Sequence, residues 1–386
     1  MHQVSAQFVA GGVRTPAGVG NLAKYFLWLG ATGFGGPIAL AARMQRDLVN
    51  ERGWICDVDY LDGLAFAQLA PGPLAAQLAM YLGYVNGGIA GATIAGVAFV
   101  LPSFLIVLGL SVAYAAFGGL MLVQAVFYGI APVVIGIIAV AACRLAAKVV
   151  KRDPLLITLF ILVGAWTVVS QRELAVLFVL AGLATLLVRH KPRGTHGLSS
   201  AWLIATTSAV NHGTVFTLFL FFSKAALFVF GSGLAIVPFL YAGVVQEHRW
   251  LTEQQFVDAV AIAMITPGPV VITVAFIGYI VAGVKGALVA AAGIFAPVYL
   301  MVILLAPIFR RHSNSDMLRS FVAGVTAAAA GGIAGAAIVL ASRSIHDVFG
   351  GVLCVIAIVA VSRSKWAEPL LIAGGGLIGI GRQILG

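Results

Sequence analysis

Two Pro-Gly-Pro tripeptides, at 71–73 and 267–269, interrupt long apolar runs and limit how this chain of 386 residues can fold. Proline lacks a backbone donor and glycine adds backbone freedom, so a helix that enters either tripeptide must end there. Residues that precede the first tripeptide recur at the same distance from the second: Glu51 and Glu247, Trp54 and Trp250, Asp62 and Asp258. The chain is therefore predicted to consist of two homologous halves that break their helices at equivalent places.

The composition is that of a membrane protein. Hydrophobic residues make up 61% of the chain and charged residues 9%, whereas a soluble domain is about a quarter charged. We therefore expect an all-α, polytopic protein in a lipid bilayer. Many of the basic residues behind the net charge of +10 lie in short loops, where the positive-inside rule explains them without a nucleic-acid partner. Contact with anionic lipid or attraction of an anionic substrate is the alternative explanation.

The apolar segments divide the chain into an N-terminal repeat at 1–190, a linker at 191–213 and a C-terminal repeat at 214–386. About six segments per half are long and apolar enough to be membrane helices, some of them short, tilted or interrupted. They lie near 22–42, 59–84, 87–117, 122–147, 154–170 and 172–189, and near 215–244, 256–281, 284–309, 320–342, 345–362 and 367–385.

The relative orientation of the halves depends on whether the linker contains an extra crossing. The most basic loop of the first half is 144–153, whereas that of the second half, 310–319, follows a different segment of the repeat. Placing both loops on the cytoplasmic side favours repeats of inverted topology.

A glycine-rich break near the end of the first segment reads Gly33-Phe34-Gly35-Gly36-Pro37, and its copy reads Phe230-Gly231-Ser232-Gly233. Backbone groups freed at that depth are tolerated only where they line a cavity or are covered by protein. The alternative is a kink that only packs against a neighbour. Because both halves keep the break, we favour a substrate-binding role for a set of small residues: Gly35, Gly36, Gly231, Ser232 and Gly233.

The Pro-Gly-Pro breaks are the stronger signal. A helix that starts after such a break presents free amides and a positive dipole end inside the membrane, which favours an anion. Neutral polar side chains flank each tripeptide and can donate hydrogen bonds to an oxyanion. A proline kink that only shapes the helix is the alternative. The predicted binding residues here are Gln68, Pro71, Gly72, Pro73 and Gln77 in the first half, and Thr266, Pro267, Gly268 and Pro269 in the second.

Charged residues between and beside the breaks are candidates for gating or coupling. The repeated acids are interpreted as proton-relay carboxylates or as first-turn acids that favour the helix dipole. The basic residues attract an anion at the mouth of the pathway or set the topology. These candidates are Arg43, Arg46, Glu51, Asp62, Lys224, Glu247 and Asp258.

No pattern in the chain predicts an enzyme, a cofactor or a metal. The three cysteines, Cys56, Cys143 and Cys354, are isolated, and no nucleotide-binding loop or metalloprotease motif occurs. Transport without an ATP motif is driven by a gradient, by a partner, or by nothing.

Taken together, the two breaks and their copies resemble the chromate ion transporter (CHR) family, as a long-chain, two-domain member of the ChrA type. The resemblance covers both halves and rests on the order and duplication of 33–37, 68–73 and Gly83-Tyr84. It implies a bacterial plasma-membrane secondary carrier that exports chromate, with halves of opposite orientation and with sulfate as the competitor of similar shape. The copies differ, since Gln68 corresponds to Met264, so one asymmetric site is expected.

We therefore expect a tetrahedral oxyanion to bind near the midplane between the helix starts after Pro71 and Pro267, with export coupled to protons through a carboxylate such as Glu51 or Asp62. A sulfate or general oxyanion carrier, a passive anion channel and a membrane chromate reductase are the alternatives. The oligomeric state is left open, a homodimer included.

Overall fold

The computed structural model describes residues 17–34, 36–170, 175–189, 213–227, 229, 233–312, 316–345, 347–363 and 368–385. Gly35, Gly231, Ser232 and all of the predicted linker except Gly213 lie outside these residues. The described residues are helical almost throughout. The elements of the first half are α1 (Val19–Thr32), α2 (Gly36–Met44), η1 (Gln45–Glu51), α3 (Asp57–Leu69), α4 (Leu74–Phe117), α5 (Met121–Val149), α6 (Pro154–Ser170) and α7 (Ala175–Arg189).

The second half repeats this order. Its elements are α8 (Thr214–Ala226), η2 (Gly233–Ile236), α9 (Val237–Leu240), η3 (Tyr241–Glu247), α10 (Glu253–Ile265), η4 (Val270–Ile272), α11 (Thr273–His312), α12 (Asp316–Ser344), α13 (Val348–Arg363) and α14 (Glu368–Leu385). Every apolar segment expected from the sequence is thus mainly helical where it is described. The all-helical class and the two repeated halves are confirmed.

The glycine-rich and Pro-Gly-Pro breaks are the tips of helical hairpins. Phe66 of α3 stacks on Tyr81 of α4 with ring centroids 5.7 Å apart, so these helices run antiparallel on either side of 71–73. The α1–α2 pair folds in the same way, because Arg43 lies over the ring of Trp28, 4.2 Å from its centroid. The predicted segments 22–42 and 59–84 therefore each contain two antiparallel helices, where the sequence suggested one interrupted crossing.

The long helices α4 and α11 also fold back on themselves. Gly88 and Gly283 both have φ of 61°, a left-handed conformation that glycine adopts without steric cost. The two arms of α4 then pack so closely that a Cβ atom on Gly83 would lie 2.4 Å from the carbonyl oxygen of Gly91. Small residues at this contact let the two backbones approach.

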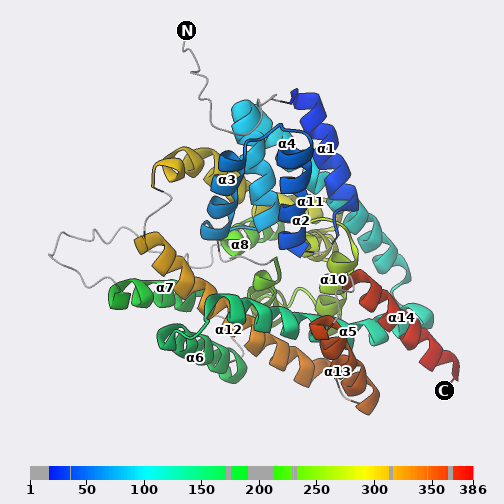
Figure 1. The fold of residues 1–386 in the computed structure, drawn as a ribbon. Coiled ribbons are helices and arrows are strands. Elements are labelled where there is room, and N and C mark those ends of the chain that lie inside the picture. The colour runs from blue at the N-terminus through cyan, green and yellow to red at the C-terminus, as the bar shows by residue number, and fades with distance from the viewer. Residues whose placement is uncertain are drawn as a thin grey trace, which may run out of the picture.

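The remaining helices exchange partners between the halves. Figure 1 shows α1 to α4 in the upper part of the molecule and α5, α6, α7, α12, α13 and α14 in the lower part. There α5 packs against α13 and α14, while its counterpart α12 packs against α6 and α7. Glycines again allow close approach, since a Cβ on Gly129 of α5 would meet the carbonyl oxygen of Gly375 at 2.1 Å.

Four apolar stretches of the described chain are long enough to cross a membrane: 74–117, 121–149, 270–307 and 319–344. Shorter apolar helices accompany them in both halves. With so many apolar side chains on its outer surface, the protein is a multi-pass membrane protein.

Candidate functional site

Four helix starts meet at one point between the halves. The first residues of α2, α4, η2 and η4 line a cavity of about 10 Å³, with room for about one water molecule. The elements that begin there are the ones that follow the predicted breaks, one glycine-rich and one Pro-Gly-Pro break from each half. Two distant segments of each half are thus brought to a common centre.

The geometry at this centre favours negative charge. Neither Pro73, which precedes α4, nor Pro269, which precedes η4, offers a side-chain cap. The first amides of a helix have no partner within the helix and carry its positive dipole end. These two helix starts therefore present backbone donors, and no basic side chain belongs to the described lining of the small cavity between them.

The central glycines of the two tripeptides join the halves. The amide of Gly72 donates to the carbonyl oxygen of Val229 at 2.6 Å, and the amide of Gly268 donates to that of Gly33 at 2.8 Å. These bonds are equivalent, because Gly33 and Val229 occupy the same place in the two halves. The amides of Gly72 and Gly268 are used here, so the donors left for an anion are those of the first turn that follows.

The predicted polar ligands differ in where they point. Gln77 is fully buried, and its Nε2 donates to the carbonyl oxygen of Pro71 at 2.8 Å. The hydroxyl group of Thr266 donates to the carbonyl of Ala263. Thr273, the first residue of α11 and not one of the predicted ligands, donates in the same way to the carbonyl of Val270. These three side chains therefore stabilise the breaks. The side chain oxygen of Gln77 is buried without a hydrogen-bond partner among the described residues.

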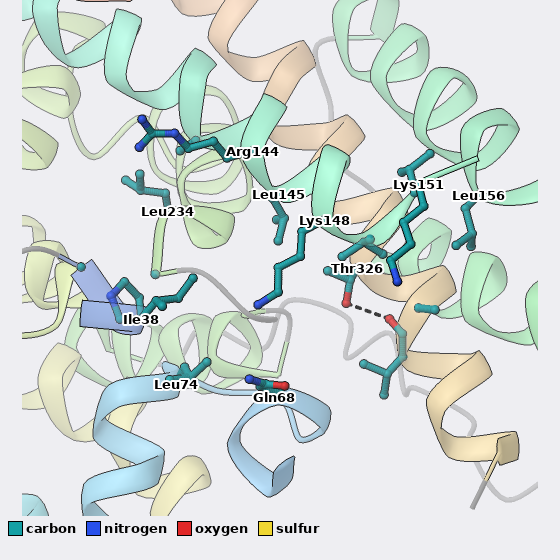
Figure 2. Close-up of a pocket in the computed structure, with 18 of the residues that line it drawn as sticks. Ile38, Gln68, Leu74, Arg144, Leu145, Lys148, Lys151, Leu156, Leu234 and Thr326 are labelled. Atoms are coloured by element: carbon teal, nitrogen blue, oxygen red, sulfur yellow. Dashed lines mark hydrogen bonds between the residues drawn. The ribbon is translucent and has the colours of Figure 1, made fainter. Parts of the chain in front are cut away.

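A second, larger cavity opens from the same centre. It has a volume of about 650 Å³, and Gly36, Leu74, Gly233 and Val270 form part of its lining. The rest comes mainly from α5 and α12, with Gln68 of α3 at one side. In Figure 2 the ammonium end of Lys148 extends from α5 toward Gln68 and Leu74. Of the predicted polar ligands that the structure describes, Gln68 is the one that lines this space.

The larger cavity is basic. Its described lining contains five basic side chains and two acidic ones, an excess of three positive charges. The basic residues are Arg144, Lys148, Lys151, Arg189 and Arg319, and the acidic ones are Asp153 and Glu368. The sequence interpretation favoured topology as the role of the basic loop residues, with contact to anionic lipid or attraction of an anionic substrate as the alternative. Their convergence on one cavity depends on the packing of α5 against α12, which no local pattern predicts.

Some of these charges are already compensated. Arg189 and Asp153 form an ion pair at 2.5 Å, and this hydrogen bond lowers the pKa of Asp153 below its ordinary value. Arg144 donates to the carbonyl oxygen of Val361. Lys148 and Lys151 make no ion pair or hydrogen bond with the residues that the structure describes.

Most of the predicted gating or coupling residues lie away from this cavity. Arg46 contacts Asp47 at 3.1 Å and Glu51 at 3.5 Å, and both Arg46 and Glu51 are largely exposed. Arg43 contacts Asp47 at 3.9 Å and lies on Trp28. These contacts tie η1 to α1 and α2. Three further candidates are exposed or half-buried and do not line the cavity as described: Asp62, Lys224 and Glu247.

Asp258 is different because it is buried between the halves. Its side chain is 3% exposed. It accepts hydrogen bonds from the hydroxyl of Tyr114 at 2.7 Å and from the amide of Gln254 at 2.8 Å. Tyr114 belongs to the first half and Asp258 to the second, so the contact connects the two repeats. The sequence predicted Asp258 as a gating or coupling residue. It did not predict Tyr114, which belongs to no recognisable motif.

A helical membrane protein of two matching halves, with broken helices that meet at the floor of a basic cavity, has the architecture of a secondary membrane transporter. A family model described as chromate transporter matches residues 20–187 and 216–380. The chain belongs to the chromate transporter family.

Relatives extend over nearly the whole chain. The chromate transport protein of Cupriavidus metallidurans is 53% identical over 369 residues, which cover 93% of this chain and 92% of the relative. The probable chromate transport protein of Synechococcus elongatus is 48% identical and covers 93% of this chain and 94% of its own length. The chromate transport protein of Pseudomonas aeruginosa is 30% identical over 85% of this chain and 82% of its own. No solved structure matches the chain.

Proposed function

We propose that this protein is a secondary carrier that exports chromate across the bacterial plasma membrane. The observation that carries the proposal is the meeting of four helix starts at the floor of a basic cavity. The names of the relatives, which are similar over nearly the full chain, support chromate as the substrate.

Chromate is a tetrahedral dianion, and the site offers what such an ion needs. First-turn amides of α4 and η4 supply hydrogen bonds and positive dipole ends. The nearby cavity supplies the uncompensated positive charge of Lys148 and Lys151. Sulfate has nearly the same shape and charge, so the same contacts accept it as a competitor.

The way α5 and α12 line the cavity supports inverted repeats. Lys148 lies at the end of α5 and Arg319 at the start of α12, yet both line the same space. The two helices are counterparts in the repeat, so they run in opposite directions. Repeats arranged this way alternate access by rocking against each other around a central site. The basic residues mark the open side as cytoplasmic, which is the side from which an exporter loads.

Of the three carboxylates Glu51, Asp62 and Asp258, Asp258 is the one best placed to couple chromate export to proton entry. Glu51 is largely exposed and Asp62 is half-buried on the outside of the cavity lining, whereas Asp258 lies between the halves and is bonded by Tyr114. A carboxylate at a boundary between moving parts exchanges a proton only when they separate. This arrangement couples proton entry to the conformational change.

The experiment that tests the function is chromate uptake by inverted membrane vesicles, with empty-vector vesicles as the control. In inverted vesicles an exporter carries chromate inward, so we expect chromate to accumulate and the rate of uptake to saturate. Added sulfate should compete with chromate, and uptake should depend on the imposed pH gradient. Uptake that never saturates would identify a passive channel. Accumulation no greater than in the control vesicles would refute the proposal.

The coupling residue is tested by Asp258→Asn, which keeps the hydrogen-bonding shape and removes the ionisable group. We expect chromate to equilibrate in this variant without responding to the pH gradient. Asp62→Asn is the matched control, because it removes the equivalent carboxylate from the other half and should retain the response. If both variants respond like the wild type, Asp258 is not the coupling residue.

A further inference from the structure

We propose that Lys148 forms a loading site, at which the oxyanion binds before it reaches the four helix starts. This inference rests on the proposed function and assigns a step of it to one side chain. Lys148 is the next-to-last residue of α5. Its ammonium group extends into the larger cavity toward Gln68 and Leu74 (Figure 2), and Leu74 is the first residue of α4 at the cavity floor.

The charges around Lys148 leave it available for an anion. Arg189 is paired with Asp153, and Arg144 is bonded to the carbonyl of Val361 and faces the negative charge of Glu368. Lys148 has no such partner among the described residues. A cation in a cavity with low-dielectric walls concentrates anions there. A lysine ammonium is a compact point charge on a flexible stem, which can hold a tetrahedral ion and then release it.

The counterpart of Lys148 in the second half is compensated. α5 and α12 each have 29 residues, and Arg343 is the next-to-last residue of α12, as Lys148 is of α5. Arg343 forms an ion pair with Glu253 of α10, and the hydroxyl of Tyr241 donates to the same carboxylate at 3.2 Å.

The repeat therefore places a cation at the same position in both halves, but it leaves only one of this pair open to an anion. Because α5 and α12 run in opposite directions, the two cations lie at opposite ends of this helix pair. The open one lies in the cavity that leads to the helix starts. The oxyanion therefore loads from the side of Lys148, because Lys148 is unpaired among the described residues whereas Arg343 is neutralised by Glu253.

The test compares initial rates of chromate uptake by inverted vesicles that contain wild type, Lys148→Gln or Lys148→Arg. We expect Lys148→Gln to raise KM about tenfold with kcat changed less than about twofold, because a charge used before the rate-limiting step affects capture. Lys148→Arg keeps the charge and should stay within about threefold of the wild-type KM. Added salt should raise the wild-type KM more than that of Lys148→Gln, since salt screens the attraction.

The matched control is Lys285→Gln, which removes the same charge from an exposed position of α11 outside the cavity lining. Its KM should equal that of the wild type. If Lys148→Gln transports with the wild-type KM and salt response, the loading site is refuted while the proposed function stands. If the wild type itself moves no chromate, the proposed function is refuted.

Discussion

Single glycines decide how the halves meet. Gly72 and Gly268 have φ of 139° and 100°, conformations that other L-residues rarely adopt. Their surroundings differ, however. A Cβ on Gly72 would lie 3.0 Å from the flexible end of Gln77, whereas one on Gly268 would lie 1.9 Å from the hydroxyl oxygen of Ser103. The two positions are equivalent in the repeat but are not equally tolerant of substitution.

We therefore predict that Gly268→Ala is more damaging than Gly72→Ala. Backbone strain costs about 1–3 kcal/mol, and at Gly268 the contact with Ser103 adds to it. The measurement is the thermal stability of the purified proteins in detergent, together with chromate uptake. Gly351→Ala is the control, because a Cβ there meets nothing within 4 Å and its stability should be unchanged. Equal stability of the Gly268 and Gly72 variants would contradict the prediction.

Helices α6 and α13 begin in the same way, at equivalent places in the two halves. Asp153 accepts hydrogen bonds from the amides of Leu155 and Leu156 and pairs with Arg189 at the end of α7. Asp347 accepts one from the amide of Gly350 and pairs with Arg382 near the end of α14 at 2.7 Å. In each half, one aspartate thus caps the start of the next-to-last helix and forms an ion pair with an arginine near the end of the last helix.

These two carboxylates predict how stability depends on pH. Hydrogen bonds from Tyr128 and Arg382 lower the pKa of Asp347 to about 2, and the bond from Arg189 lowers that of Asp153. A depressed pKa means that the stabilisation is complete above the ordinary value and is lost as the pH falls through the folded-state value.

We expect no change in thermal stability from these groups between about pH 5 and pH 8, since both carboxylates stay ionised there. Asp153→Asn with Asp347→Asn should lower the stability by about 1 kcal/mol per site, because exposed ion pairs and caps contribute little. The measurement is thermal unfolding in detergent across that pH range. A transition near neutral pH that vanishes in the double variant would contradict the assignment.

The sequence predicted where the helices break better than it predicted which residues form the site. Each break lies where proline and glycine prevent a helix from continuing, so 71–73 and 267–269 could be located from local chemistry alone. The bond from Gly72 to Val229 could not be predicted, because it depends on how two distant hairpins meet. The same is true of Lys148 and Gln68, whose common cavity exists only after α5 packs against α12.

Across the whole molecule, the repeat offers a test of alternating access that uses its own symmetry. Leu145 of α5 lines the open cavity and is partly exposed. Leu340 occupies the equivalent position in α12 and is 1% exposed. If the halves are inverted and only one side is open, cysteines at these equivalent positions should differ in reactivity.

We predict that Leu145→Cys reacts rapidly with a membrane-impermeant maleimide in inverted vesicles, whereas Leu340→Cys does not. The background carries Ser at Cys56, Cys143 and Cys354, so that only the introduced thiol is labelled. Adding Glu253→Gln frees Arg343 from its ion pair and should increase the labelling of Leu340→Cys from the opposite face, in right-side-out vesicles. Equal labelling of the two cysteines in inverted vesicles, or an effect of Glu253→Gln on the same face as Leu145→Cys, would contradict the inverted arrangement. A shift confined to the opposite face is what two halves that rock about a common centre require, because opening one side must close the other.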